Sequence, residues 1–331
     1  MKKTMGIQIS SVAVYHPETI RDNQYYIDFY GKKGFLAKSL MEDVFGRSKR
    51  YVIEPGSGEN SISMAIEASK KALSQANLTS QDIDLICLSS SSPEYLNPPG
   101  ALLIHQSLKG KSDTFCFDVN ASCAGMLFAL KMVTHYMETN KRIRTVLLVG
   151  SDSFTPLSNP QKIENYVCFG DASCAVILQK TAGTSKIIDS DVYVESEKCD
   201  FATAPLCGLS NIIHAPREQL YYHLGDITIS TRDCAQIIKK MLHRNHMKIE
   251  DISLILVSQY TKKIGQELWD YLGATESQRI YVGDQYGYTG TSSPFVSLYE
   301  AIQQKRIKRG DYIIIWTVGS SAQYVMLLLR Y

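Results

Sequence analysis

The sequence lacks a strong excess of charge of either sign. Its 331 residues include 35 Lys and Arg against 33 Asp and Glu, which gives a net charge of +2. A chain this close to neutrality has no overall field to attract nucleic acid or an anionic membrane surface, so neither is expected as a partner. It also lacks a membrane-length apolar run and a signal-peptide pattern near its N-terminus. We therefore expect a cytoplasmic protein that does not cross the membrane.

Paired cysteine motifs are absent as well. None of the eight cysteines forms a CxxC pair, and most of them stand inside apolar segments. This spacing argues against a zinc site and a disulfide framework and favours reduced thiols. We expect neither a metal nor a cofactor. The eight are Cys87, Cys116, Cys123, Cys168, Cys174, Cys199, Cys207 and Cys234.

What the sequence does contain is an internal duplication. Three separated segments recur at a constant offset of 169 residues, the distance from Gly150 to Gly319 at the ends of two apolar strands. Agreement at one offset over separated elements predicts a duplicated α/β unit. The other matching segments are the helix-like 61–73 with 230–242, and 81–86 with 250–255.

The predicted halves are residues 1–180 and 181–331. Their strands are nearly continuous runs of Val, Ile and Leu, which is typical of a sheet covered by helices on both faces. We expect the halves to pack as one body, with an irregular segment at about 195–223 that covers a site. The offset pairs Cys123 with Ser292, so function is expected where two equivalent strand-to-helix turns meet.

Cys123 stands in the segment FDVNASCAGM (117–126), where an apolar strand runs into a helix. A cysteine at the first turn of a helix lies near the positive end of the helix dipole, which favours the thiolate. Its small neighbours would let an acyl group approach the backbone. The alternative is a small apolar residue that fills a tight turn, because free cysteine is among the most buried residue types. The residues alone leave both interpretations open.

Five segments together resemble the β-ketoacyl-acyl-carrier-protein synthase III family, and the likeness follows the chain in order over nearly its whole length. They are NASCAGMLFAL (120–130), TVLLVGSDS (145–153), CFGDASCAVIL (168–178), YGYTGTSSP (286–294) and VGSSAQYVMLLLRY (318–331).

The resemblance implies a duplicated thiolase-like α/β fold, with two pseudo-twofold-related halves in an αβαβα layered body, and it implies a dimer. It also implies that Cys123 is a nucleophile acylated by a thioester. The oxyanion hole would then use the backbone N–H of Cys123 and one from the turn Gly319-Ser320-Ser321, and such donors are commonly worth a few kcal/mol each in the transition state.

Two positions depart from the pattern of this family. Ser258 stands where the family has a histidine, and Tyr288 stands where it has an asparagine. These two groups stabilise the enolate that forms when a malonyl thioester loses carbon dioxide, so standard decarboxylative condensation is not expected. His223 is a candidate substitute base that would face Cys123. The alternative for His223 is a half-exposed loop residue.

Binding residues are also inferred from the resemblance. The tryptophan and arginine that clamp the adenine of coenzyme A in the family are missing, with Leu40 and Ile163 nearest their positions. An acyl-carrier-protein thioester is therefore favoured over a coenzyme A thioester as donor. Met126, Asn97 and the segment 195–223 are expected to line or cap the acyl channel.

Two hypotheses for function follow. In the first, Cys123 accepts an acyl group from a thioester and passes it to an acceptor in fatty-acid or specialised-metabolite assembly. In the second, the chain is a catalytically degenerate subunit of a heterodimer with a complete synthase-III-like partner. A full condensing enzyme with rearranged groups is a third alternative. The sequence does not decide between a homodimer and a heterodimer.

Overall fold

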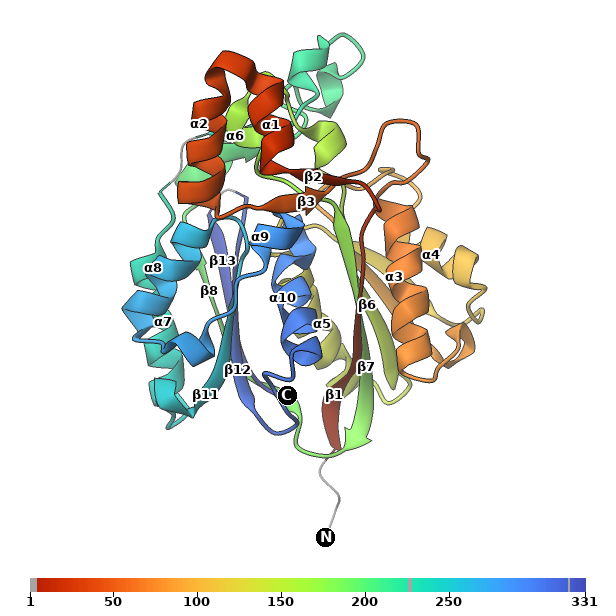
Figure 1. The fold of residues 1–331 in the computed structure, drawn as a ribbon. Coiled ribbons are helices and arrows are strands. Elements are labelled where there is room, and N and C mark those ends of the chain that lie inside the picture. Colours follow the sequence, from red (N-terminus) through yellow and green to blue (C-terminus); the bar gives the residue numbers. More distant parts are fainter. Residues whose placement is uncertain (1–4, 226–227, 321) are drawn as a thin grey trace.

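Two β-sheets stand side by side in the computed structural model, which describes residues 5–225, 228–320 and 322–331 (Figure 1). The first has the strand order β1-β7-β6-β4-β5, and the second has the order β11-β12-β13-β8. The first sheet comprises β1 (Met5–Tyr15), β7 (Ala172–Ala182), β6 (Thr145–Asp152), β4 (Leu85–Ser89) and β5 (Phe115–Val119). The second comprises β11 (Ile252–Val257), β12 (Tyr312–Gly319), β13 (Gln323–Arg330) and β8 (Lys186–Val194).

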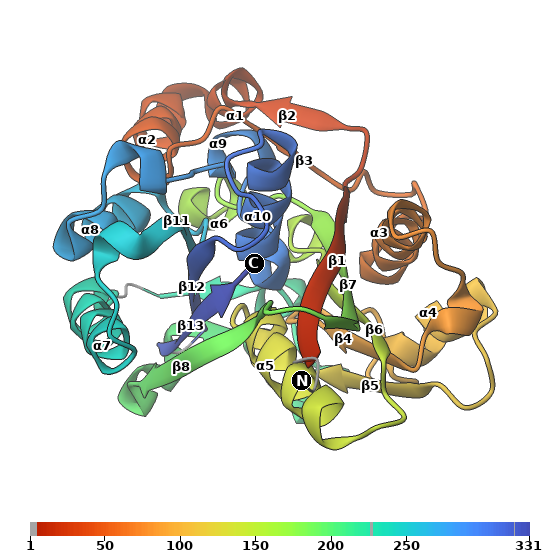
Figure 2. The same ribbon diagram turned by 90° about the horizontal axis from the view of Figure 1, so that it is seen from below.

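Helices fill the three layers around these sheets, as the view from below shows (Figure 2). Two central helices lie between the sheets: α5 (Gly125–Thr139) and α10 (Ser293–Gln303). The outer face of the first sheet is covered by α3 (Ser61–Gln75) and α4 (Gly100–Leu108). The outer face of the second is covered by α7 (Thr231–Arg244) and α8 (Lys262–Leu272). The predicted αβαβα body is confirmed.

The duplication is visible element by element. The pairs β4 and β11, β6 and β12, and α5 and α10 occupy equivalent places in the two halves. The halves differ at β5, which has no equivalent strand in the second sheet. The matching residues there belong to the short helix α9 (Gly283–Tyr286) and the turn at Gly287, whose φ of 73° is left-handed. A glycine in the left-handed conformation interrupts extended backbone, so this segment does not form a strand, whereas the apolar residues of β5 do.

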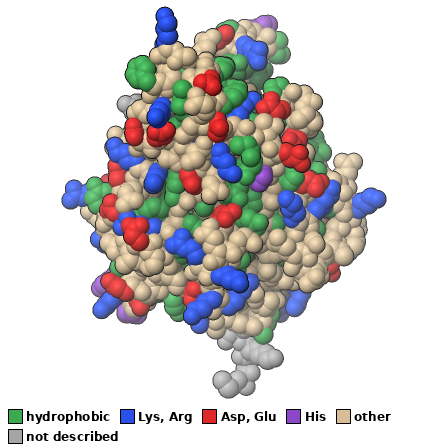
Figure 3. Space-filling model, in the orientation of Figure 1, with side chains coloured by type: hydrophobic (Ala, Val, Ile, Leu, Met, Phe, Trp, Pro, Cys, Tyr) green, Lys and Arg blue, Asp and Glu red, His purple; other side chains and the backbone are tan. Residues whose placement is uncertain are grey.

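Burial explains why these strands read as continuous apolar runs. Every residue of β4 and β6 is buried, because helices cover both faces of the first sheet. The outer helix α7 instead alternates a buried face with an exposed one, as its helical spacing of apolar residues predicts. No helix in the described part of the chain is long and apolar enough to span a membrane. Acidic and basic side chains intermingle over the face shown in Figure 3.

A cap lies over one end of both sheets, formed by residues 20–51 and 196–224 (Figure 1). The irregular segment consists of short 3-10 turns and a small antiparallel pair of strands, β9 (Ala202–Thr203) and β10 (His223–Leu224). The other elements of this end are β2 (Ile20–Asp22), β3 (Lys49–Tyr51), α1 (Asn23–Tyr30), α2 (Gly34–Ser39) and, beside the cap, α6 (Ile163–Tyr166).

Candidate active site

Cys123 lies in a tight turn between the end of β5 and the start of α5. The preceding residue, Ser122, has a φ of 54°, a left-handed conformation that non-glycine residues seldom adopt. Gly125, the first residue of the helix, has no room for a side chain, because a Cβ there would lie 2.3 Å from the Ser89 hydroxyl. The side chain of Cys123 is only 5% exposed. The strained turn and the small residues around it therefore hold the thiol at the buried end of α5.

The second half of the chain fixes this turn from the opposite side. Ser320, just after β12, donates its backbone N–H to the Ser122 hydroxyl at 3.1 Å. Gly319 packs so closely that a Cβ would lie 3.0 Å from the Ala121 carbonyl oxygen. Thr291 accepts the backbone N–H of Met126 through its hydroxyl at 2.7 Å. The two equivalent strand-to-helix turns thus meet, as the repeat predicts. Ser292 itself is buried, and its hydroxyl donates to the Ala172 carbonyl of β7 and bonds to Thr289.

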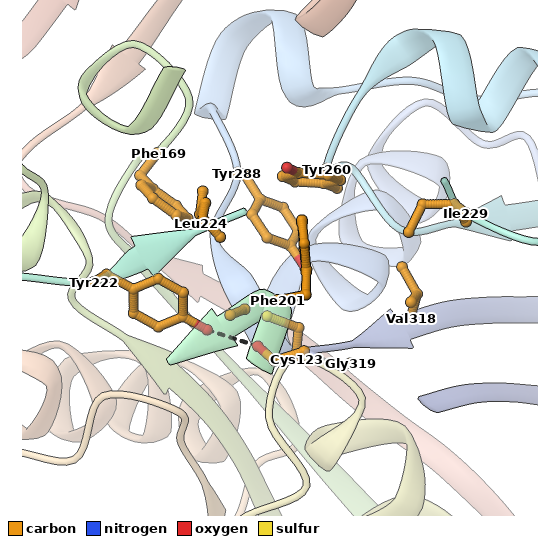
Figure 4. A pocket seen from close by; sticks show the side chains of 12 residues that line it. Cys123, Phe169, Phe201, Tyr222, Leu224, Ile229, Tyr260, Tyr288, Val318 and Gly319 are labelled. Atoms are coloured by element: carbon orange, nitrogen blue, oxygen red, sulfur yellow. Dashed lines mark hydrogen bonds between the residues drawn. The ribbon is translucent and has the colours of Figure 1, made fainter. Parts of the chain in front are cut away.

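Aromatic side chains close the space above the thiol (Figure 4). The cavity there has a volume of about 30 Å³, which is room for about one water molecule. Its wall comes from both halves and from the cap: Phe169, Phe201, Ala202, Tyr222, Leu224, Ile229, Tyr260, Tyr288, Val318, Gly319 and Ser320. The Tyr222 hydroxyl bonds to the Ser320 hydroxyl at 2.6 Å, and this contact holds the cap segment down over Cys123.

Tyr288 points its phenol toward the Cys123 sulfur (Figure 4). Its ring stacks on Phe169 with centroids 6.1 Å apart and meets Tyr260 edge-on at 5.3 Å. Burial raises the pKa of Tyr288 well above its ordinary value, and the adjacent Cys123 raises it further. The phenol is therefore neutral at physiological pH. It can donate a hydrogen bond to the thiol, but it cannot act as a base.

Ser258 is fully buried and lies beside Tyr288, where its hydroxyl lowers the pKa of the phenol. In the described residues its oxygen nevertheless makes no hydrogen bond of normal geometry. A buried hydroxyl without a partner is costly, so this oxygen is available to a group that enters the site. Ser258 and Tyr288, distant in sequence, thus lie together at Cys123.

The thiol of Cys123 is neutral in this environment. Burial raises the pKa of Cys123 to about 12, and the nearby carboxyl of Asp152 adds to the shift. Hydroxyls of Tyr288, Ser91 and Ser122 oppose it. The shift from the ordinary value of 9.0 corresponds to about 4 kcal/mol, whereas a helix terminus contributes at most about 2 kcal/mol. Burial therefore outweighs the helix-end stabilisation of the thiolate that the sequence predicts.

A larger cavity of about 610 Å³ adjoins the site, and we call it the vestibule. It shares Leu224, Ile229 and Tyr260 with the wall of the Cys123 cavity, so these three side chains separate the two spaces. The remaining lining residues are Val44, Phe45, Glu164, Gly225, Thr228, Thr261, Lys263, Ile264 and Glu267. A substrate arm that enters from the vestibule would reach the thiol only after these three side chains move.

Other predicted residues lie away from the thiol. The side chain of His223 is exposed, and its neighbours Tyr222 and Leu224 line the cavity instead. Asn97 is exposed in the loop after β4. Met126 is buried against Gly150. None of these three residues lines the Cys123 cavity, so their roles as base and acyl channel stay predictions. Ser321, predicted in the oxyanion turn, lies outside the described residues.

Four groups in or near the cavity were not singled out from sequence: Ser91, Asp152, Phe169 and Tyr222. Tyr222 lies in the segment 195–223 that was expected to line or cap the channel, and Phe169 lies in the family-like segment 168–178, but only the fold shows that these two rings face the cavity. The segment GSDS (150–153) did hold a signal, because a charged residue that ends a buried apolar strand must be paired or hydrogen-bonded. In the structure, Asp152 is fully buried and interacts with the Cys123 thiol.

Comparison with known proteins agrees with this architecture. Residues 117–196 match the model of 3-oxoacyl-[acyl-carrier-protein (ACP)] synthase III, and residues 242–331 match the model of its C-terminal part. The chain is 28% identical over 269 residues to a β-ketoacyl-[acyl-carrier-protein] synthase III of Aquifex aeolicus, covering 81% of this chain and 83% of that protein.

Solved structures show the same fold. The 3-oxoacyl-[acyl-carrier-protein] synthase III of Aquifex aeolicus superposes with a TM-score of 0.86 at 24% identity, covering 98% of this chain and 100% of that one. The priming β-ketosynthase of the R1128 polyketide pathway also gives a TM-score of 0.86, at 19% identity, covering 98% and 96%. The thiolase-like fold class and the family resemblance predicted from sequence are confirmed. The chain belongs to the 3-oxoacyl-[acyl-carrier-protein] synthase III family.

Proposed function

We propose that the protein is an acyltransferase that takes an acyl group from a thioester onto Cys123 and passes it to an acceptor, without standard decarboxylative condensation. The reaction would serve fatty-acid or specialised-metabolite assembly. The observation that carries the proposal is the placement of Cys123 in a strained turn, at the floor of an aromatic cavity that adjoins a vestibule. A packing cysteine would need neither the strain nor the second cavity.

The groups beside the thiol support transfer rather than condensation. An enolate requires a strong donor that stabilises its developing negative charge. Ser258 and Tyr288, which we place at the positions of the family histidine and asparagine, respectively, offer neutral hydroxyls. The Tyr288 ring also fills space that a second thioester would need, since the cavity measures about 30 Å³. An acceptor that is already a nucleophile, such as an amine or a thiol, does not require the site to stabilise an enolate.

Acyl carrier protein is the donor we favour. Leu40 and Ile163 pack partly buried against the aromatic cluster of the cap and offer no flat aromatic face for adenine. Lys262 and Lys263 stand together at the start of α8 and would attract an acidic carrier protein. The vestibule that Lys263 lines also contains Glu164 and Glu267.

We propose that a second chain pairs with β5, in a homodimer or a heterodimer. This strand is the edge of the first sheet and carries Phe115, which is 41% exposed. The ring of Phe115 meets Tyr136 of α5 edge-on at 6.1 Å, and Met132, one turn away, is 52% exposed. An edge strand beside exposed apolar side chains favours association. Because Cys123 follows β5 directly, the partner would lie close to the site.

The alternative function is a degenerate subunit that shapes the pocket of a complete partner. One observation favours it: the thiol is neutral, with a pKa raised to about 12 by burial, and is closed off by aromatic rings. In that case Cys123 would be a packing residue, and acylation would occur only on the partner chain.

Intact-protein mass spectrometry separates the two functions. The wild type, Cys123→Ala and Cys199→Ala would be incubated with a series of acyl-carrier-protein and acyl-coenzyme A thioesters. Cys199 is an exposed cysteine and controls for surface acylation. We expect one acyl adduct in the wild type and in Cys199→Ala, and none in Cys123→Ala. No adduct from any donor, together with co-purification of a histidine-bearing homologue, would favour the degenerate subunit.

A further inference from the structure

Asp152 is a fully buried carboxyl group at the end of β6, and no counter-ion stands beside it in the described part of the chain. In the described residues no Lys, Arg or His side chain pairs with it, and all its recorded bonds come from hydroxyls and backbone N–H groups. Burial raises its pKa, while these donors oppose the shift. A buried carboxyl group that only neutral donors satisfy is expensive to ionise, so its presence beside the thiol points to a role beyond packing.

The two oxygens of this carboxyl group are not equivalent. Oδ1 accepts four bonds, from the Ser90 hydroxyl at 3.2 Å and from Ser91 and Ser92, with the Ser91 backbone N–H at 2.6 Å. Oδ2 accepts only two, from the Thr291 backbone N–H at 2.8 Å and from the Ser91 hydroxyl at 3.4 Å. Oδ1 is saturated, whereas Oδ2 keeps the capacity to take a proton from the direction of Ser91.

The Ser91 hydroxyl also lies near enough to Cys123 to lower the pKa of its thiol, although no hydrogen bond of normal geometry joins the two in the described residues. Ser91 is therefore a neighbour of both the thiol and Oδ2 of Asp152. The 3.4 Å separation from Oδ2 is longer than the usual 2.7–2.8 Å between hydroxyl and oxygen. A small rotation of the Ser91 side chain would shorten this contact, since the residue is only partly buried.

We propose that Ser91 relays the proton of Cys123 to Asp152, and that this relay replaces the histidine as the means of activating the thiol. The inference rests on the proposed function, in which Cys123 is the nucleophile. The thiol proton passes to Ser91 Oγ while the Ser91 hydroxyl proton passes to Oδ2. The thiolate then attacks the thioester carbonyl, and the carbon–sulfur bond of the donor breaks.

The leaving group departs as a thiolate. In the second half-reaction the acceptor displaces the acyl group, and the Cys123 sulfur regains its proton from Asp152 through Ser91. The proton that the acceptor loses neutralises the released thiolate through water. Atoms and charges balance, and no co-reactant is required.

Other titratable groups around this path cannot replace Asp152. Besides Cys123, the groups that face it are Tyr222 and Tyr288, whose pKa values burial raises far above 10. Both remain neutral at physiological pH, and a neutral phenol cannot take up the thiol proton. Asp152 is thus the only described side chain in contact with the path that can accept a proton.

The pH dependence of thiol alkylation tests the relay without any acyl donor, so its failure is distinguishable from the failure of the proposed function. Wild type, Ser91→Ala and Ser90→Ala would be labelled with iodoacetamide between pH 6 and 9, and the Cys123 peptide would be quantified by mass spectrometry. Ser90 is the matched control, because its hydroxyl bonds to Asp152 but not to Cys123.

An internal proton transfer to ionised Asp152 does not depend on the pH of the solvent, and burial raises the pKa above which Asp152 is ionised. Above that pKa we therefore expect a flat rate profile in the wild type and in Ser90→Ala, and a rate at pH 7 at least tenfold lower in Ser91→Ala, rising about tenfold per pH unit. Asp152→Asn should behave like Ser91→Ala where it folds. A wild-type rate that rises tenfold per unit, equal profiles in the two serine variants, or no labelling of Cys123 would overturn the relay.

Discussion

Replacing Tyr288 with alanine should enlarge the acyl cavity and lower stability at the same time. The ring is almost completely buried, with 4% exposure, and it packs against Phe169 and Tyr260. Buried aromatic side chains remove about 150–250 Å² from water, and truncation to alanine costs about 3–5 kcal/mol. Urea unfolding should show a loss of stability in this range.

Tyr288→Ala would create space beside the Cys123 thiol. The present cavity of about 30 Å³ is smaller than any but the smallest acyl group. With Tyr288 removed, the rate of acyl loading onto Cys123 should rise for chains of four to eight carbons relative to acetyl. The assay is the mass spectrometric time course of loading from a chain-length series of thioesters, compared as ratios between wild type and Tyr288→Ala.

A matched control separates access from destabilisation. Phe154 is fully buried in the same aromatic cluster, stacks on Phe169 at 4.7 Å and does not line the cavity. Phe154→Ala should therefore cost a similar 3–5 kcal/mol while leaving the chain-length preference unchanged. If Tyr288→Ala folds but keeps the wild-type preference, the acyl group does not use this space, and the assignment of the cavity is refuted.

Three further predictions concern catalysis, pH and assembly. The double variant Ser258→His with Tyr288→Asn should gain malonyl decarboxylation, detected as release of carbon dioxide; an unchanged rate would mean that other parts of the site have diverged. Burial raises the pKa of Asp171 from 3.8 to about 6. The folded state therefore binds this proton more tightly, and the associated stability is present below pH 4 and lost as pH rises through 6. Relative to Asp171→Asn, the wild type should lose about 2 kcal/mol between pH 4.5 and 7.5 in urea unfolding, and identical pH dependence would contradict this. Phe115→Lys should weaken the proposed dimer at least tenfold in sedimentation experiments, whereas an unchanged association constant would exclude an interface at β5.

The architecture can be predicted from the sequence because the duplicated segments recur at a constant spacing. A fixed offset of 169 residues locates the paired strands and helices, and the structure places them equivalently around α5 and α10. The missing partner of β5 was not predicted, because the helix α9 that takes its place depends on tertiary packing. The local sequence pattern predicts the helices and strands, whereas tertiary packing against neighbouring segments decides where a sheet ends.

The site was predictable only where a local motif exists. Small residues around a strand-to-helix junction identify Cys123 in the sequence, and Tyr288 is identified by its position directly after Gly287. Phe169 and Tyr222 come from distant segments in which nothing marks these two side chains as cavity residues, and Ser91 is one of four consecutive serines. The pKa of Cys123 could not be predicted from the sequence. Proximity to a helix end is visible in sequence, but the burial that dominates the pKa of Cys123 is a property of the folded chain.

The raised pKa of Cys123 makes the nearby carboxyl group central to either function. With a pKa of about 12, only about one thiol in 10⁵ is ionised at pH 7, a cost of about 7 kcal/mol to any reaction that needs the free thiolate. An ordinary charged base would be disfavoured in so buried a cavity, since it would carry its own desolvation cost. The six hydrogen bonds that Asp152 accepts lower the cost of ionising it there. A proton that moves from Cys123 to Asp152 leaves the net charge of the cavity unchanged and only relocates it by one serine. The path through Ser91 would therefore supply the thiolate that acyl transfer requires without placing a new charge in the cavity, and acyl loading of Cys123 tests the transfer itself.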